Sequence, residues 1–431
     1  MTTGTVFVAT CDLAAQVRGR AAPVSRLEQT LRGGVGWVPA NLALNSFGDL
    51  AGGNMFGSVG DLRLMPDPAT AIDLPADERT PGTRLYLADQ TGLDGSPWPG
   101  CPRGFLRAAL DDLRERAGLE IHASFEHEFM LEGGERGDDP PFSFQRARRA
   151  EPFGTDLVTL LEDAGLEPET WLPEYGPGQF EITLRPAPGL AAADRAVLLR
   201  ELVRDLARRR GHRATFAPIP DPESVGNGVH VHFSLRQAGG GPVMYDAGAP
   251  GRLSAVAAAF AAGVLKHAAA VVAVTAPSPA SCIRLTPHRW SSGGVFLAER
   301  NREALLRIAP TVAVGDADPA AQLHLEYRAA DATANPWLVL GVLVRAGLAG
   351  LAAGEPARVW PESSSEADLA GEPPLPASPQ EALAALETDE AARGWFPPEL
   401  LHTFLTVRRS ELDHVAGLPS HELCRKVADV H

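Results

Sequence analysis

The sequence predicts an α+β fold with two domains, a small one at residues 1–100 and a larger one at residues 101–431. A chain of 431 residues is longer than one ordinary domain. Segments that alternate apolar and polar residues, as strands do, are interspersed with segments of helical periodicity. The segment from Gly95 to Pro102 is rich in glycine and proline, which helices and central strands exclude, so we place the domain boundary there.

The elements of the larger domain follow from periodicity. Apolar residues recur at helical spacing from Phe105 to Leu113, and a strand-like run extends from Glu120 to Leu131. Further strands are predicted at Gln179–Leu184, Thr215–Pro218, Val229–Leu235 and Leu323–Arg328, and helices at Ala192–Arg210, Leu253–Ala273 and Pro336–Ala353. The polar segment 132–144 predicts an insertion loop, and the acidic, proline-rich segment 361–379 predicts a surface connection.

Composition narrows the class of protein. With 45% hydrophobic and 22% charged residues, the chain is typical of a soluble globular protein, and its net charge of −15 disfavours nucleic acid as a partner. The four cysteines are widely spaced and no secretory signal is visible, so a cytoplasmic location is expected. Lys266 and Arg345 interrupt the two alanine-rich stretches, so we expect buried helices there and no membrane span.

Short strand motifs place chemically active side chains on shared faces. Strand residues two apart point the same way. Glu126 and Glu128 therefore share one face of a strand, and His230 and His232 share one face of another. The same geometry recurs around Glu326, and a tight turn after Glu174 leads into a strand in which Glu181 shares a face with Gln179.

The groups collected in this way suit a hard divalent cation. Carboxylate oxygens with a single imidazole nitrogen favour Mg²⁺ or Mn²⁺ over zinc or copper. The candidate ligands are Glu126, Glu128, Glu174, Glu181, His230 and Glu326. Any one of them alone is more often a solvated side chain. Their repetition on successive strands indicates a metal site of the kind used in phosphate chemistry.

Arginines are the candidates for phosphate binding. The chain has only two lysines, Lys266 and Lys426, and neither follows a glycine-rich P-loop pattern. The arginines close to the strand motifs are Arg284, Arg302, Arg307 and Arg328. Guanidinium groups match phosphoryl and carboxylate oxygens in a bidentate way. For Arg302 and Arg307, in a strand–turn setting, geometry alone supports a functional role and simple solvent exposure equally.

The motifs resemble those of the glutamine synthetases, in order, along nearly the whole chain. The matching segments are Asp61–Asp67, Glu126–Phe129, Glu174–Glu181, Ala214–Phe216, Gly228–His232, Arg284-Leu285, Asn301-Arg302, Glu326–Arg328 and Ala334–Pro336. The resemblance implies a small N-terminal β-grasp domain and a large catalytic domain whose antiparallel sheet lines the active site. It also implies a homo-oligomer of hexameric rings or a dodecamer, in which one N-terminal domain closes the neighbouring active site.

The resemblance further implies an ATP-dependent ligase that phosphorylates a carboxylate, expected to be glutamate, and then forms an amide with an amine. Two or more Mg²⁺ or Mn²⁺ ions would be bound, one by Glu128, Glu174 and Glu181 and another by Glu126, His230 and Glu326. The ATP phosphates would be contacted by His232, Arg302 and Arg307, the transferred phosphoryl group by Arg328, and the acid by Arg284 and the loop of Gly228.

The chain departs from the family at the ammonia end of the site. Ammonia-using members carry a glutamate on a flap that follows an arginine-leucine-x-proline run. Here Pro287 is followed by His288, Arg289 and Trp290, so a tryptophan stands at the glutamate position. The ammonium motif of the N-terminal domain is also absent, with Asp49 as a candidate substitute. An indole suits an alkyl amine through packing or cation–π contact, so we expect an organic amine as substrate.

Three alternatives stay open. Ordinary glutamine formation would use Asp49 or water in place of the missing acids and would depend on ammonium. A non-catalytic relative would keep the fold alone, although a scaffold has no need to gather so many carboxylates. A metal-dependent hydrolase or decarboxylase would work without ATP. The loop of residues 225–228 also differs from the family pattern, so the sequence leaves the acid substrate open.

Overall fold

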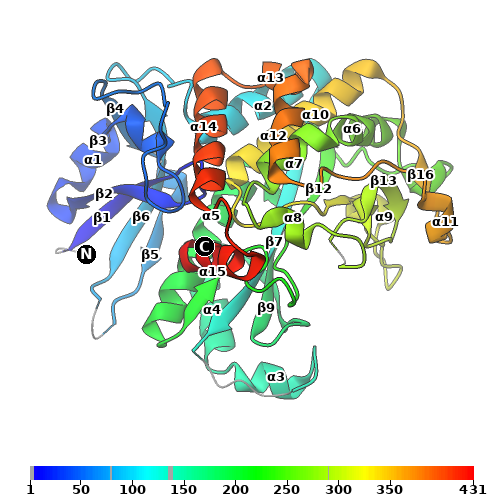
Figure 1. Cartoon of the computed structure of the whole chain (residues 1–431), viewed down its shortest axis with the longest axis horizontal. Coiled ribbons are helices and arrows are strands. Elements are labelled where there is room, and N and C mark those ends of the chain that lie inside the picture. The colour runs from blue at the N-terminus through cyan, green and yellow to red at the C-terminus, as the bar shows by residue number, and fades with distance from the viewer. Residues whose placement is uncertain (1–3, 78–79, 134–138, 290) are drawn as a thin grey trace.

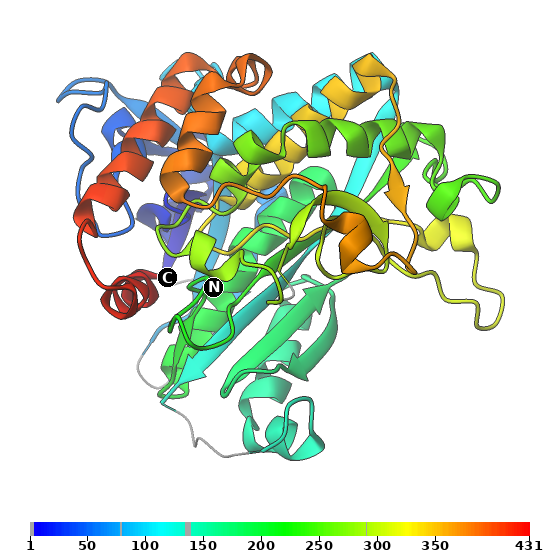
Figure 2. The same ribbon diagram turned by 45° about the vertical axis from the view of Figure 1, so that its right-hand side comes forward.

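The computed structural model describes residues 4–77, 80–133, 139–289 and 291–431. Figures 1 and 2 show a small N-terminal sheet domain beside a larger body in which helices pack on a long, twisted sheet. The small and large domains agree with the predicted α+β class. The chain crosses between them after β6, where α2 begins at Pro102 with Cys101 as its N-cap.

The N-terminal domain is built on a six-stranded mixed sheet. Its strands follow the order β2-β1-β6-β4-β3, with β5 beside β6. The pair β1 and β6 is parallel and the other pairs are antiparallel. The elements are β1 (Thr5–Cys11), β2 (Val17–Pro23), α1 (Leu27–Gly33), β3 (Val35–Trp37), β4 (Leu62–Pro66), β5 (Ile72–Leu74) and β6 (Thr83–Thr91). The helix α1 packs against β4 and β2, as the expected β-grasp arrangement requires.

The catalytic domain contains a ten-stranded sheet in the order β16-β13-β14-β15-β12-β7-β9-β8, with β10 and β11 also paired to β7. It is antiparallel from β14 to β8, as predicted for the sheet that lines the active site, and parallel at the β16-β13-β14 edge. The strands are β7 (Leu119–Glu132), β8 (Pro168–Pro173), β9 (Gln179–Leu184), β10 (Ala187–Pro188), β11 (Arg213–Thr215), β12 (Val229–Gln237), β13 (Gly294–Glu299), β14 (Ala304–Ile308), β15 (Leu325–Tyr327) and β16 (Val359–Trp360).

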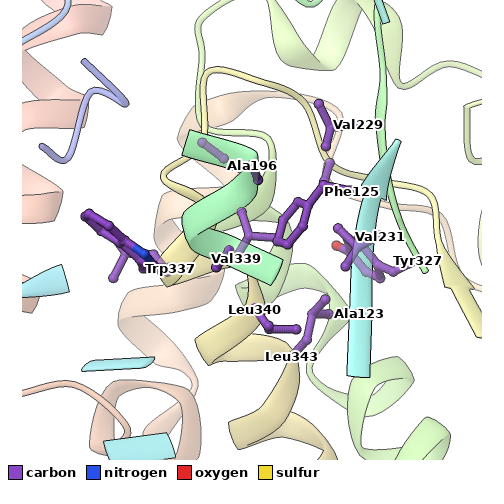
Figure 3. Packing of buried hydrophobic residues seen from close by; sticks show 14 of the residues in the cluster. Ala123, Phe125, Ala196, Val229, Val231, Tyr327, Trp337, Val339, Leu340 and Leu343 are labelled. Carbon is purple, nitrogen blue, oxygen red and sulfur yellow. The ribbon is translucent and has the colours of Figure 1, made fainter. Parts of the chain in front are cut away.

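Helices cover the apolar face of this sheet. The helices of the catalytic domain are α2 (Pro102–Ala117), α3 (Phe144–Arg149), α4 (Phe153–Asp163), α5 (Gly189–Arg209), α6 (Ala255–Lys266), α7 (Ala268–Thr275), α8 (Ser281–Arg284), α9 (Pro319–Gln322), α10 (Pro336–Ala353), α11 (Glu366–Leu369), α12 (Pro379–Thr388), α13 (Glu390–Gly394), α14 (Pro398–His414) and α15 (Ser420–Val430). In Figure 3, Phe125 and Val231 of the sheet lie close to Ala196 of α5 and Val339 of α10. This packing leaves the opposite face of the strands for polar side chains.

The helix α10 is the apolar centre of the domain. By length and composition it could cross a membrane, as could the bent pair of α6 and α7, but 67% of the α10 window is buried inside the protein. It crosses α6 closely, because a Cβ atom on Gly263 would lie 2.0 Å from the Ala346 carbonyl oxygen and one on Gly350 would lie 2.1 Å from the Ala259 oxygen. Both helices are therefore core helices, as predicted.

Two predicted elements differ from the structure. The helix predicted at Leu253–Ala273 is two helices bent by 77°, because His267 leaves the helical conformation and its Nδ1 lies 2.6 Å from Asp389 Oδ2. The strand predicted at Thr215–Pro218 is instead β11, which ends at Thr215. Beyond it the Phe216 N–H donates to the His431 carbonyl oxygen, so the chain leaves the sheet there.

A buried arginine joins the two domains. Arg103 of α2 is 1% exposed and donates to Asp194 of α5 and to Asp67 and Asp89 of the N-terminal domain, at 2.7 to 3.0 Å. The indole N–H of Trp337 donates to the same Asp194 carboxylate at 2.8 Å. The network satisfies each buried charge and fixes the N-terminal sheet against the catalytic domain.

Candidate active site

One face of the large sheet carries a row of charged side chains across five strands. The register pairs Glu181 with Glu128, Glu126 with His230, His232 with Glu326, and Glu326 with Arg307. Residues directly opposite each other in antiparallel strands share a face. The alternate residues Phe125, His127 and Phe129 are at most 2% exposed and form the core. The alternation predicted for β7 and β12 is therefore present, and pairing of the strands joins the separate motifs.

Glu126 bridges both histidines of β12. Its Oε1 lies 3.0 Å from His230 Nδ1, and its Oε2 lies 3.1 Å from His232 Nε2. Burial disfavours the charged form of Glu126, but the two histidine contacts outweigh it and hold the pKa of Glu126 well below its ordinary value. Glu126 is thus an anion at the centre of the row.

The histidine contacts also define the charge on His232. His324 Nδ1 lies 2.7 Å from the Gln322 carbonyl oxygen, which can only accept, so His324 Nε2 is left as an acceptor for His232 Nδ1 at 3.0 Å. His232 then donates from both ring nitrogens, one to His324 and one to the Glu126 carboxylate. Burial disfavours this cation, but Glu126 and Glu326 raise the pKa of His232. A cationic imidazole suits a bound phosphate.

Glu326 is the second permanent anion of the row. It accepts a hydrogen bond from Arg307 Nη1 at 2.6 Å and one from Arg328, and it lies 3.6 Å from His230 Nδ1. Burial opposes ionisation of Glu326, yet His230 and the arginines lower its pKa to about 2. The fold therefore brings Glu326 together with His230, Arg307 and Arg328.

The other end of the row holds carboxylates with too little positive charge around them. Burial and neighbouring carboxylates raise the pKa of Glu181 to about 10, and burial raises that of Glu128 to about 7. Burial also raises the pKa of Glu174. Glu128 accepts from the Gly228 N–H at 2.8 Å, and Gln179 Nε2 lies 3.4 Å away. These groups repel one another when they are ionised.

This excess of buried carboxylate fits a divalent cation. An ion would neutralise the repulsion, and the oxygen-rich donor set matches Mg²⁺ or Mn²⁺. In the part of the chain that the structure describes, no three of these groups already surround a common point closely enough to hold an ion. Binding would therefore draw the carboxylate oxygens together.

Arg284 provides a buried cation beside the row. It is 4% exposed, its Nη2 donates to the Ala330 carbonyl oxygen at 2.7 Å, and its Nε has no hydrogen-bond partner among the described residues. Burial lowers its pKa. A Cβ atom on Gly226 would lie 2.6 Å from Arg284 Cγ, and one on Gly228 would lie 3.1 Å from Arg284 Nη1. The two glycines let this loop approach a guanidinium that can receive an anionic substrate.

Three candidates have other placements. Arg302 is exposed in the turn before β14, near enough to Glu174 to oppose the rise in that carboxyl pKa. Asp49 is exposed and lies 3.1 Å from His414 Nδ1, on the N-terminal side of the molecule, so it does not join the row within this chain. Trp290 lies outside the described residues. The adjacent Arg289 donates to the carbonyl oxygens of Ser224 and Pro222, which ties this segment to the loop before β12.

Sequence reasoning missed three residues that support the row. Gln179 was placed on the correct face but without a role, and its amide donates to the Gly226 carbonyl oxygen at 2.9 Å. His324 precedes β15 and gives no motif signal. Arg146 of α3 reaches the turn at residues 174–176 from a distant segment. Only the first could have been found from strand alternation.

Comparison with known proteins places this geometry in context. The family model described as "Glutamine synthetase, catalytic domain" matches residues 99–425, and "Glutamine synthetase N-terminal domain" matches residues 4–98. A gamma-glutamylpolyamine synthetase, GlnA3 of Streptomyces coelicolor, is 35% identical over 96% of this chain and 90% of its own. The glutamine synthetase of Methanocaldococcus jannaschii is 29% identical over 84% of this chain and 82% of its own.

Solved structures agree with these sequence matches. A crystal structure described as a novel glutamine synthase homolog has a TM-score of 0.93 and 43% identity, covering 100% of this chain and 99% of its own. GmaS in complex with ADP has a TM-score of 0.83 and 25% identity, covering 97% of this chain and 95% of its own. Both likenesses include the sheet that carries the charged row.

Proposed function

The chain belongs to the glutamine synthetase family, and from this premise we propose that it joins glutamate to an organic amine at the expense of ATP. The observation that supports this proposal best is the row from Glu181 to Arg307, in which buried carboxylates, imidazoles and guanidinium groups meet on one sheet face. Enzymes of this family are ATP-dependent ligases, and ATP and divalent metal ions are general to it.

In the first step the γ-phosphoryl group of ATP moves to the acid carboxylate and ADP leaves. His232, Arg302 and Arg307 bind the phosphates, and Arg328 stabilises charge on the transferred group. Divalent ions would be held by Glu128, Glu174 and Glu181 and by Glu126, His230 and Glu326, and they would supply further neutralisation of phosphate charge. Arg284 holds the acid, with Gly228 leaving space beside it.

In the second step the amine nitrogen attacks the acyl carbon and loses a proton to solvent, and the carbon–oxygen bond breaks to release phosphate. Two features support an organic amine. Trp290 stands where ammonia-using members carry a glutamate, and Asp49 is engaged by His414. A relative that is 35% identical over 96% of this chain is named a gamma-glutamylpolyamine synthetase. We propose that the amine site lacks the anions that select ammonium and offers an apolar wall to an alkyl chain.

The test is phosphate release from ATP with Mg²⁺ and glutamate, comparing ammonium with alkyl amines, polyamines and amino alcohols. Release that an organic amine stimulates far more than ammonium supports the proposal. Release with ammonium and no organic amine would make this a glutamine synthetase. Hydrolysis of a substrate in the absence of ATP would instead favour a metal-dependent hydrolase. A chain that releases no phosphate with any pair would act on another acid or not be a catalyst. Glu326→Gln is the inactive control, because it removes a carboxylate that would hold a divalent ion and that Arg307 contacts.

Assembly and location are part of the same proposal. We propose rings of subunits, as hexamers or dodecamers, in the cytoplasm, with the loop of Asp49 facing a neighbouring subunit. The four cysteines, Cys11, Cys101, Cys282 and Cys424, are free thiols, which suits a reducing compartment. Light scattering coupled to size exclusion measures the subunit number directly.

A further inference from the structure

Arg146 is buried in a helix that otherwise lies at the surface. It belongs to α3, where Ser143 caps the helix by accepting from the Arg146 N–H at 3.2 Å. Arg146 is 9% exposed, whereas its neighbours Arg148 and Arg149 are exposed. Burying a guanidinium is unfavourable unless its N–H groups form hydrogen bonds, so this side chain must have acceptors inside the protein.

Among the described residues, every acceptor of the Arg146 side chain is a backbone carbonyl oxygen. Nη1 lies 2.5 Å from the oxygen of Glu174, 3.1 Å from that of Tyr175 and 3.0 Å from that of Gly176. Nη2 lies 2.5 Å from the oxygen of Asp139. Within the described ranges of the chain, Arg146 forms no ion pair with a carboxylate. The three contacts of Nη1 are all with one turn, residues 174–176, which we call the Glu174 turn.

Three successive carbonyl groups that converge on one point repel one another, because their negative ends are brought together. A cation at that point removes the repulsion and fixes the backbone. The opposite side of the Glu174 turn is held by Gln179, whose Oε1 accepts from the Gly176 N–H at 2.9 Å and whose carbonyl oxygen accepts from the Glu174 N–H at 2.8 Å. The turn is therefore clamped between Arg146 and Gln179.

The clamp determines where the Glu174 carboxylate lies. The carboxylate accepts from the Tyr175 N–H at 2.9 Å, which keeps it at the turn, and it is close enough to Glu181 and Glu128 to raise the pKa of both, so it belongs to the carboxylate end of the row. We propose that Arg146 is a positioning residue for metal binding, which holds the Glu174 turn so that Glu174 stays beside Glu128 and Glu181. The inference rests on the proposed function, because it takes Glu174 as a metal ligand.

The test measures Mn²⁺ binding to the full chain without ATP, using the electron paramagnetic resonance signal of free Mn²⁺. Arg146→Met keeps an aliphatic chain but no donors, and Arg146→Lys keeps the charge with a different head group. Arg148→Met is the matched control on the same helix. We expect Arg146→Met to weaken one class of Mn²⁺ sites about tenfold, the lower end of the effect of residues that orient metal ligands. Arg146→Lys should recover part of this loss, and Arg148→Met should match the unmodified chain.

A double-mutant cycle of Arg146→Met and Glu174→Gln tests whether Arg146 acts on metal binding through Glu174. Glu174→Gln should weaken the same class of sites, and adding Arg146→Met should weaken it no further, because the residue that Arg146 positions is already lost. Unchanged Mn²⁺ affinity in both Arg146 variants, additive losses in the double variant, or unchanged binding in Glu174→Gln would each overturn the proposal. Arg146→Lys provides the test if Arg146→Met does not fold. Failure of the ligase assignment is a separate result, seen when the unmodified chain binds Mn²⁺ but releases no phosphate with any amine.

Discussion

Replacing Glu128 with glutamine should flatten the pH dependence of folding stability in the metal-free protein. Burial raises the pKa of Glu128 to about 7, from an ordinary value of 4.5. Between these values the folded chain keeps a proton that the unfolded chain has released, so the free energy of unfolding falls as pH rises. For this one group the fall is about 2 kcal/mol between about pH 5.5 and pH 8. The glutamine variant has no such proton, so that part of the slope should disappear.

Urea unfolding in EDTA at the two pH values, at one fixed protein concentration, measures the difference. Glu120→Gln on the same strand is the matched control, since Glu120 is partly exposed in an ion pair with Arg114. At the higher pH, Mn²⁺ should stabilise the unmodified chain more than Glu128→Gln, because the ion takes the place of the proton. Equal pH slopes for the unmodified chain and Glu128→Gln would refute the view that burial of this carboxyl group prepares it for a metal ion.

Three further changes test the acid site, the domain interface and the helix crossing. Arg284→Lys should raise the KM for glutamate at least about tenfold and leave the KM for ATP unchanged in the phosphate-release assay, because an ammonium group cannot reproduce the guanidinium fork; a matching rise in both constants would contradict this. Arg103→Met should lower the free energy of unfolding by about 3 kcal/mol in urea titration, since it leaves three aspartates without their shared cation. Gly263→Ala should lower the melting temperature, because the new methyl group would meet a carbonyl oxygen at 2.0 Å, whereas Gly371→Ala, with open space around it, should not.

The strand motifs could be predicted because alternation within a strand is a local property. The faces of β7 and β12 follow from two-residue periodicity, and Gln179–Leu184 and Pro336–Ala353 match their elements at both ends. Periodicity says nothing about which strands become neighbours. The resemblance to a known family, together with the pairing of β9, β7, β12, β15 and β14, was needed to bring the motifs into one row.

Contacts between distant segments were not predictable. The break at His267 depends on Asp389, which lies 122 positions away, so the helical periodicity of this segment did not reveal a bend of 77°. The buried charge of Arg103 and the carbonyl contacts of Arg146 likewise depend on partners that only the tertiary fold supplies. The sequence therefore predicts which residues can do the chemistry better than it predicts which residues hold them in place.

The two ends of the charged row differ in how readily their carboxyl groups ionise. At one end His230, Arg328 and Arg307 outweigh burial and lower the pKa of Glu326 to about 2, so this carboxylate is ionised at any working pH. At the other end, Glu128 accepts in the described structure only from neutral amide groups, and the pKa of Glu181 is raised to about 10. An ion bound at the Glu326 end displaces few protons, whereas an ion bound at the Glu181 end must displace the protons that those carboxyl groups hold. The ion at the Glu181 end should therefore bind more tightly as pH rises and release protons on binding, and its affinity should depend on pH more steeply than that of the ion at the Glu326 end.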